Sequence, residues 1–170
     1  MLLIGRNIII RDFKEEDFEP FFTLLKDKTN HDLAGLEYTE DPDFAKKLFT
    51  LYQKRDDAHV IAQKDTDLMV GIFEINKRGE SIGLAQTREI GFVIGKAYRK
   101  KSYATESVNL VINYGFNRIN LTEIWASTEE SNKVPQKILE KLKFKYIYSA
   151  QQALPFTAQS QSLKYYLLKK

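Results

Sequence analysis

A strand that turns into a helix through a short basic segment is the feature that most constrains this chain. Residues 89–94, Glu-Ile-Gly-Phe-Val-Ile, read as a strand, and residues 107–119 repeat apolar side chains at helical spacing. Between them stand Arg99, Lys100, Lys101 and Ser102. The first turn of a helix leaves backbone N–H groups unpaired and carries the positive end of the helix dipole. The junction therefore predicts an anion site, most simply a phosphate site.

The segments before this junction predict a strand, two helices and then three strands. Residues 8–11 form an apolar strand, and the acids of 12–17 suit the first turn of a helix that continues to Leu25. A polar connector is expected over 30–41, and Asp41-Pro42 opens a second helix that ends near 55–57. Strands are expected at 59–63, 68–76 and 88–94, and their short connections favour antiparallel neighbours.

After the junction, the pattern continues with helix, strand, helix and two closing strands. The helix before Ile119 has one apolar face on which Gly115 allows close packing on a sheet, and a strand is expected at 121–126. The next helix runs from Asn132 to about Phe144, with Val134, Ile138 and Leu142 expected to face inward. The closing strands are expected at 145–149 and 163–168, with a glutamine-rich connector at 151–161.

This order, β-α-α-β-β-β-α-β-α-β-β, predicts an α/β protein of the α+β kind: a mixed, mostly antiparallel sheet flanked by helices, with one crossover at the anion loop. At 170 residues, we expect one domain spanning 1–170. We leave a homo-oligomer open, because the closing strands expose a sheet edge that can pair with another subunit.

Composition excludes several kinds of chemistry. The chain has no cysteine, which rules out disulfides, thiolate metal ligands and a cysteine nucleophile. Its two histidines, His31 and His59, have no third ligand at recognisable spacing, so no metal site is expected. The net charge of +3 does not demand a nucleic-acid partner. With no secretory signal and no run of about 20 apolar residues, we expect a cytoplasmic protein without a membrane partner.

Four short motifs together resemble the GNAT acetyltransferase superfamily, and within it the RimJ/RimL-like N-acetyltransferases. Residues 89–92 are similar to the family's Glu-Ile-Gly-aromatic strand, and residues 103–106, Tyr-Ala-Thr-Glu, to its helix start. Arg99, Ser102 and Ala104 occupy the signature positions of its Q/R-x-x-G-x-G/A loop. Asn132 and residues 139–144 resemble its Asn and Leu-Glu-Lys-x-Gly-Phe segment. The resemblance covers nearly the whole chain.

The resemblance implies that acetyl-CoA is the cosubstrate and that this chain binds it along the strand and the loop. The implied contacts are the backbone of Phe92, Val93 and Ile94, the loop and helix start Arg99, Lys100, Lys101, Ser102, Tyr103, Ala104 and Thr105, and Asn132. Glu89 matches the glutamate that serves as the general base in some family members. The connector after the first helix helps form the acceptor pocket in this family, which makes His31, Glu37, Glu40 and Asp41 candidates there.

This chain departs from the family pattern at four positions. Ser102 and Lys143 stand where glycine is usual, and serine in the loop either tolerates the backbone geometry or adds a hydroxyl donor. Pro135 and Leu139 match positions from which a serine or tyrosine often protonates the leaving thiolate, and neither can donate a proton. A water, or Tyr98, Tyr103 or Tyr146, would have to substitute. Lys133, Lys137 and Lys141 share a helix face that either meets the cosubstrate's 3′-phosphate or only solvates the helix.

The leading hypothesis is transfer of an acetyl group from acetyl-CoA to a primary amine by direct attack, without an acyl-enzyme. The acceptor is left open between a protein N-terminus and a small-molecule amine. The alternative is a catalytically silent GNAT module that binds acyl-CoA in a regulatory or interaction role. A nucleotide-binding protein is disfavoured because neither G-x-G-x-x-G nor G-x-x-x-x-G-K-S/T occurs in the chain.

Overall fold

The computed structural model describes residues 1–153 and 160–170. The strands are β1 Leu3–Ile4, β2 Ile8–Arg11, β3 Ala58–Gln63, β4 Met69–Lys77, β5 Thr87–Ile94, β6 Glu123–Glu129, β7 Lys145–Ala153 and β8 Ser160–Lys169. The α-helices are α1 Phe18–Leu25, α2 Lys28–Ala34, α3 Pro42–Lys54, α4 Tyr103–Asn117 and α5 Lys133–Lys141. Short 3₁₀ turns lie at Glu15–Asp17, Ile82–Leu84 and Lys96–Tyr98.

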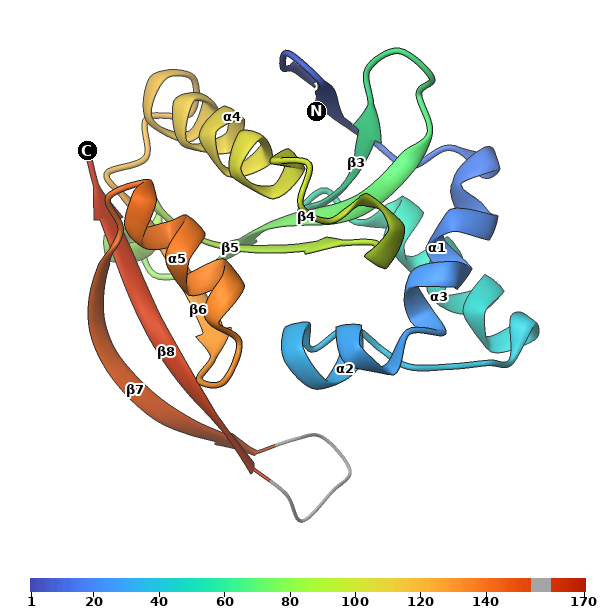
Figure 1. Ribbon diagram of the computed structural model, residues 1–170. Helices are drawn as coiled ribbons and strands as arrows, with labels where there is room; N and C mark the ends of the chain where they lie inside the picture. Colours follow the sequence, from blue (N-terminus) through green and yellow to red (C-terminus); the bar gives the residue numbers. More distant parts are fainter. Residues whose placement is uncertain (154–159) are drawn as a thin grey trace.

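All of these strands belong to one eight-stranded sheet in the order β1-β2-β3-β4-β5-β6-β8-β7. Within the described residues, every neighbouring pair is antiparallel except β5 and β6, which are parallel and are connected through α4. The expected α+β fold with a mixed, mostly antiparallel sheet is therefore confirmed. The expectation of a single crossover is wrong, because β8 lies between β6 and β7, and the connection through α5 is a second crossover. Figure 1 shows α4 above the sheet, α1 and α3 on its other side, and the β7–β8 hairpin extending away from the body.

Two apolar clusters hold the helices on the two faces of the sheet. On one face, Val108 and Val111 of α4 and Leu139 of α5 pack with Ile90 and Ile124 of the central strands. On the other face, Phe21 of α1 and Phe49 of α3 are fully buried against β3 and β4. Gly115 of α4 has the expected packing role, because a Cβ there would lie 2.9 Å from a Leu121 methyl group.

The structure corrects several expectations about the elements. Part of the expected connector 30–41 is helix α2, which is capped at its start by the Asp27 side chain and at its end by Gly35 in the left-handed conformation. A short strand, β1, precedes the first expected strand. β6 begins and ends later than expected, and β7 continues to Ala153. Residues 154–159 of the expected glutamine-rich connector lie outside the described residues.

Helix α5 differs from its expected orientation. Val134 was expected to face inward but has 69% of its surface exposed, whereas Gln136 and Leu139 are buried. Gln136 satisfies its buried amide by donating to the carbonyls of Glu129 and Glu130. The apolar face of α5 is therefore divided between the core, which receives Leu139, and the cavity described below.

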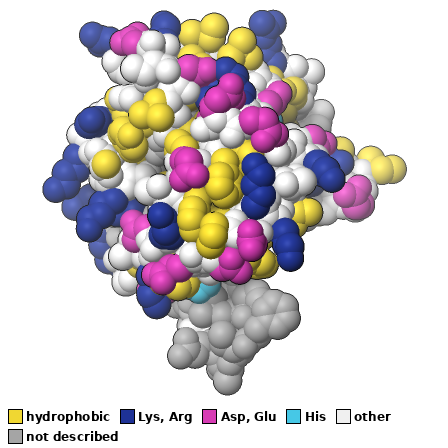
Figure 2. All heavy atoms as spheres, turned by 90° about the vertical axis from the view of Figure 1, so that its right-hand side faces the viewer, with side chains coloured by type: hydrophobic (Ala, Val, Ile, Leu, Met, Phe, Trp, Pro, Cys, Tyr) yellow, Lys and Arg dark blue, Asp and Glu magenta, His cyan; other side chains and the backbone are white. Residues whose placement is uncertain are grey.

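The surface that includes α1, α2 and α3 carries acidic and basic side chains interspersed among exposed hydrophobic ones (Figure 2). Phe44 and Leu51 of α3 contribute to its exposed apolar area, at 44% and 59% exposure. Among the residues that the structure describes, no helix is both long and apolar enough to cross a membrane.

Candidate active site

The central parallel strands separate at one end and form a cleft. β5 and β6 pair from Thr87 opposite Glu123 to Ile90 opposite Ala126. Beyond that point, β5 continues to Ile94 and β6 to Glu129 without pairing to each other. A cavity of about 480 Å³ is lined by Phe92, Val93 and Ile94 where β5 is free of β6. Backbone groups on this side of β5 are available to an extended ligand.

The basic segment forms the second wall of this cavity. Tyr98, Arg99, Lys100 and residues 102–105 line it, and α4 begins there at Tyr103. Lys100 and Ser102 both adopt left-handed backbone conformations, with φ of 64° and 63°. Ser102 therefore accommodates the backbone geometry for which glycine is usual, and its hydroxyl does not cap α4. The N-terminus of α4 faces the cavity, as an anion site requires.

The Arg99 side chain connects the loop to α2. Its Nη2 donates to Asn30 Oδ1 at 2.8 Å, and its Nε donates to the Ile94 carbonyl at 3.0 Å. Asn30, which is 2% exposed, donates in turn to the Leu24 carbonyl at 3.0 Å. The Asp27 carboxylate lies 3.7 Å from Arg99 Nη2. Hydrogen bonds from Thr29 and the nearby Arg99 charge hold the pKa of Asp27 below its usual value, so this pair stays ionised.

Helix α2 reaches across the open end of the cleft to α5. Asn132 Nδ2 donates to the Leu33 carbonyl at 3.3 Å, and Asn132 itself lines the cavity. Figure 1 shows α2 near the end of β5 and across from α5. The cavity is therefore bounded by the loop, by α2 and by the first turns of α5, from which Val134, Pro135 and Ile138 also contribute.

Glu89 lies where the two strands begin to separate, although it does not line the cavity. Its Oε1 accepts a 2.8 Å hydrogen bond from Ser127 Oγ, and its Oε2 is 3.6 Å from Arg78 Nε. Ser127 is the first residue of β6 beyond the paired part. Glu89 is thus a partly exposed carboxylate, fixed in position beside the apex of the cleft.

Of the other residues that the sequence suggested for the site, some line the cavity and others lie outside it. Lys101 is outside the cavity, with its Nζ 5.6 Å from the centre of the Tyr98 ring. Tyr103 lines the cavity and its hydroxyl accepts from Gln63, whereas Tyr146 is exposed on β7. Leu139 is fully buried and cannot face a ligand. This cavity is not lined by His31, Glu37, Glu40 or Asp41, and neither is a second, smaller cavity that also includes Phe92 and Val93 of β5 in its walls.

Sequence reasoning missed the contribution of α2. Thr29, Asn30, Leu33 and Ala34 all line the cavity, but they fell within or beside a segment interpreted as a polar connector. The signal that would have found them is the pair of caps, Asp27 and Gly35, which bracket a helix of only seven residues. Residues 1–153 and 160–170 hold no group of three metal-ligating side chains.

Comparison with known proteins identifies the architecture. The acetyltransferase (GNAT) domain model matches residues 7–145. The chain is 32% identical over 159 residues to "Probable N-acetyltransferase YjcK" of Bacillus subtilis, an alignment that covers 84% of this chain and 83% of that protein.

Solved structures have the same fold. The GNAT-family acetyltransferase from Bacillus anthracis superimposes with a TM-score of 0.86 at 19% identity, covering 99% of this chain and 98% of that one. Spermidine N-acetyltransferase from Vibrio cholerae, in complex with CoA and spermine, gives a TM-score of 0.78 at 15% identity, covering 96% and 95%.

Proposed function

This chain belongs to the GNAT acetyltransferase family and is an N-acetyltransferase, and we propose that it transfers the acetyl group of acetyl-CoA to a primary amine. We further propose that it belongs to the RimJ/RimL-like branch, on the strength of Asn132 and the segment 139–144. The observation that carries the proposal is the cavity beside the part of β5 that β6 does not pair, with a basic helix start at its side.

The residues around the cavity fit acetyl-CoA, which GNAT acetyltransferases use. An extended pantetheine arm needs backbone hydrogen-bond partners along one side, and Phe92, Val93 and Ile94 provide a strand segment that β6 does not pair. A pyrophosphate needs unpaired N–H groups and positive charge, and Ser102 to Thr105 together with Lys100 provide both. Arg99 holds this loop against α2, while Asn132 closes the opposite wall.

Transfer requires that the amine lose its proton and that the thioester carbonyl be polarised. Acetyl-CoA supplies an activated acyl group with a thiolate leaving group. Glu89 is our candidate general base, since its carboxylate is oriented by Ser127 at the apex of the cleft. Backbone N–H groups of β5 near Phe92 would stabilise the negative charge that develops on the carbonyl oxygen.

The binding part of the proposal is tested by thermal unfolding with and without acetyl-CoA. Saturating acetyl-CoA at about 100 times its Kd should stabilise the protein by about 2.7 kcal/mol, which is several degrees in Tm. Mixing the protein with acetyl-CoA and a panel of amines should then release free CoA thiol. Stabilisation without thiol release for any amine would favour a silent acyl-CoA binder, and no stabilisation would contradict both roles.

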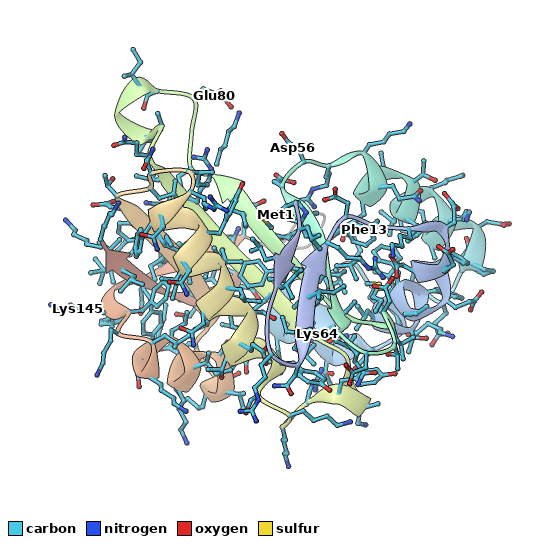
Figure 3. All side chains as sticks on the ribbon, turned by 90° about the horizontal axis from the view of Figure 1, so that it is seen from above. Met1, Phe13, Asp56, Lys64, Glu80 and Lys145 are labelled. Carbon is cyan, nitrogen blue, oxygen red and sulfur yellow. The ribbon has the colours of Figure 1, made fainter. Side chains whose placement is uncertain are left out.

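The base assignment is tested by Glu89→Gln. We expect kcat to fall about 10²–10⁴-fold, as is typical when a general base is removed, with the acetyl-CoA Kd nearly unchanged. Glu80→Gln is the matched control, because Glu80 lies on the projecting loop between β4 and β5 (Figure 3) and lines neither cavity near β5. Unchanged turnover in Glu89→Gln would remove this residue from the mechanism.

A further inference from the structure

A second, smaller cavity adjoins the first one from the other face of the sheet. It has a volume of about 60 Å³ and shares Ala34, Phe92 and Val93 with the larger cavity. Its remaining walls include Tyr52, Ile72 and Glu74. A group bound here would therefore lie next to the part of β5 where the proposed function puts the thioester.

Glu74 presents a free carboxylate oxygen in this smaller cavity. It stands on β4 directly opposite Gly91 of β5. Its Oε1 forms an ion pair with Arg55 Nη1 at 2.8 Å, whereas Oε2 has no hydrogen bond within the described part of the chain. A Cβ at Gly91 would lie 3.5 Å from Oε2. Because glycine has no side chain, nothing at position 91 covers this oxygen.

The charge near Glu74 favours a cation. Arg55 is shared between Glu74 and Asp57, whose Oδ1 accepts from Arg55 Nε at 2.7 Å, so two carboxylates face one guanidinium. Tyr52 packs beside them, with the Arg55 guanidinium carbon 5.0 Å from the centre of its ring. Burial raises the pKa of the Tyr52 hydroxyl, which therefore stays neutral and adds no further charge.

We propose that Glu74 binds the amino group of the acceptor through Oε2, and that the acceptor is an unbranched primary alkylamine. This proposal rests on the proposed function. The size of the cavity supports the substrate class, because about 60 Å³ corresponds to roughly two water molecules. Such a space holds an aminomethyl end, and it suits this end better than an α-amino group, whose carbon also carries a side chain and a carbonyl.

Glu74 and Glu89 then have separate tasks on the same face of the sheet. Residues 89 and 91 of β5 point to the same side, and Glu74 lies opposite residue 91. The two carboxylates therefore flank Gly91. Glu74, neutralised in part by Arg55, is suited to holding the amine, while Glu89 is left to remove its proton.

The proposal is tested by titrating the CoA-bound protein with 1,3-diaminopropane in a calorimeter, which requires no turnover. We expect Glu74→Gln to weaken diamine binding at least tenfold while the CoA Kd stays unchanged. In the thiol-release assay, the same variant should raise KM for the diamine more than it lowers kcat. Two peptides distinguish the possible sources of the amine. An Nα-acetylated lysine peptide offers only a side-chain alkylamine, and a lysine-free peptide with a free N-terminus offers only an α-amino group.

Two variants separate binding from a structural role. Asp57→Asn removes the other carboxylate from Arg55 and leaves Glu74 in place, so diamine binding should weaken less than in Glu74→Gln, even if Tm falls. Gly91→Ala places a methyl group at ordinary contact distance from Oε2 and should fold normally. We expect it to weaken diamine binding several-fold without changing CoA binding.

The outcomes are distinct for the two proposals. If the wild type binds the diamine through Glu74 but releases no CoA thiol, the acetylation proposal fails and the amine site stands. If the wild type turns over amines and Glu74→Gln binds the diamine as well as the wild type does, the amine site is wrong. Preference for the free-N-terminal peptide over both alkylamines would overturn the substrate class, and absence of any amine binding would overturn the site.

Discussion

Ser102 and Lys143 occupy left-handed backbone positions at opposite ends of two helices. Ser102 precedes α4 with φ of 63°, and Lys143 follows α5 with φ of 71°. Lys143 continues a turn in which its N–H donates to the Glu140 carbonyl and the Phe144 N–H donates to the Leu139 carbonyl, at 3.0 Å each. Both positions therefore keep the conformation that suits glycine. For a residue with a Cβ, this left-handed conformation costs about 1–2 kcal/mol of stability.

Ser102→Gly and Lys143→Gly should each stabilise the protein. Glycine relieves the left-handed strain but has more freedom to lose on folding, so we expect a net gain of about 0.5–1 kcal/mol and a rise of about 1–3 °C in Tm. Lys47→Gly, on the exposed side of α3, is the control and should lower Tm, because glycine in a helix interior costs about 0.5–1 kcal/mol. A lower Tm in Ser102→Gly would show that the serine side chain contributes contacts of its own.

At the scale of elements, length decided what the sequence could predict. α3 and α4 span 13 and 15 residues and were found from their apolar spacing, and β2 was found with its bounds unchanged. α2 has only seven residues and no apolar stripe, since only Asn30 is buried in it. Its stability comes from contacts that are distant in sequence, such as Arg99 with Asn30, and periodicity cannot reveal these.

Asn30→Ala should loosen α2 specifically. The substitution leaves the Leu24 carbonyl and the Arg99 guanidinium without a buried partner, which costs about 1–3 kcal/mol and lowers Tm by about 3–10 °C. Hydrogen exchange of amides 28–34 should accelerate more than that of α4, and the acetyl-CoA Kd should rise. Lys28→Ala, which removes the exposed pair with Asp32, should change stability by only about 0.5 kcal/mol. Equal protection of the α2 amides from hydrogen exchange in both variants would contradict the proposed stabilisation of α2 by the hydrogen bonds of Asn30.

At the scale of the whole molecule, the site arises from pairings that no single motif contains. The motif around Glu89 predicted the strand, and the basic loop predicted an anion site. No sequence pattern marked Glu74 as a site residue. Its place depends on the register between β4 and β5, which sets it opposite Gly91. It depends also on Arg55, 19 positions earlier in the chain, which fixes one of its oxygens. Local sequence patterns set neither the register nor this ion pair.

Stability should fall in two separate steps as pH decreases, because a buried histidine and a partly exposed, ion-paired carboxylate take up protons in different pH ranges. Burial lowers the pKa of His59 below its ordinary value of 6.5, although the adjacent Asp12 opposes this. The unfolded chain therefore binds this proton first, and stability decreases as pH falls from about 6.5 toward the folded pKa. Asp67 follows at lower pH: the Lys14 ammonium lowers its pKa most and Arg11 adds to this, so its contribution, present above its ordinary 3.8, is lost as pH falls through the lowered value.

These two steps are measured by thermal unfolding between pH 8 and pH 3. His59→Gln should flatten the decrease of Tm that begins near pH 6.5 and leave the acidic step intact, whatever its effect on the absolute Tm. Asp67→Asn should lower Tm at neutral pH, because Arg11 is only 6% exposed and loses a charged partner. The same variant should reduce the step below pH 4, since position 67 then holds no carboxylate that titrates there. A decrease of Tm from pH 6.5 that persists unchanged in His59→Gln would assign that step to another group.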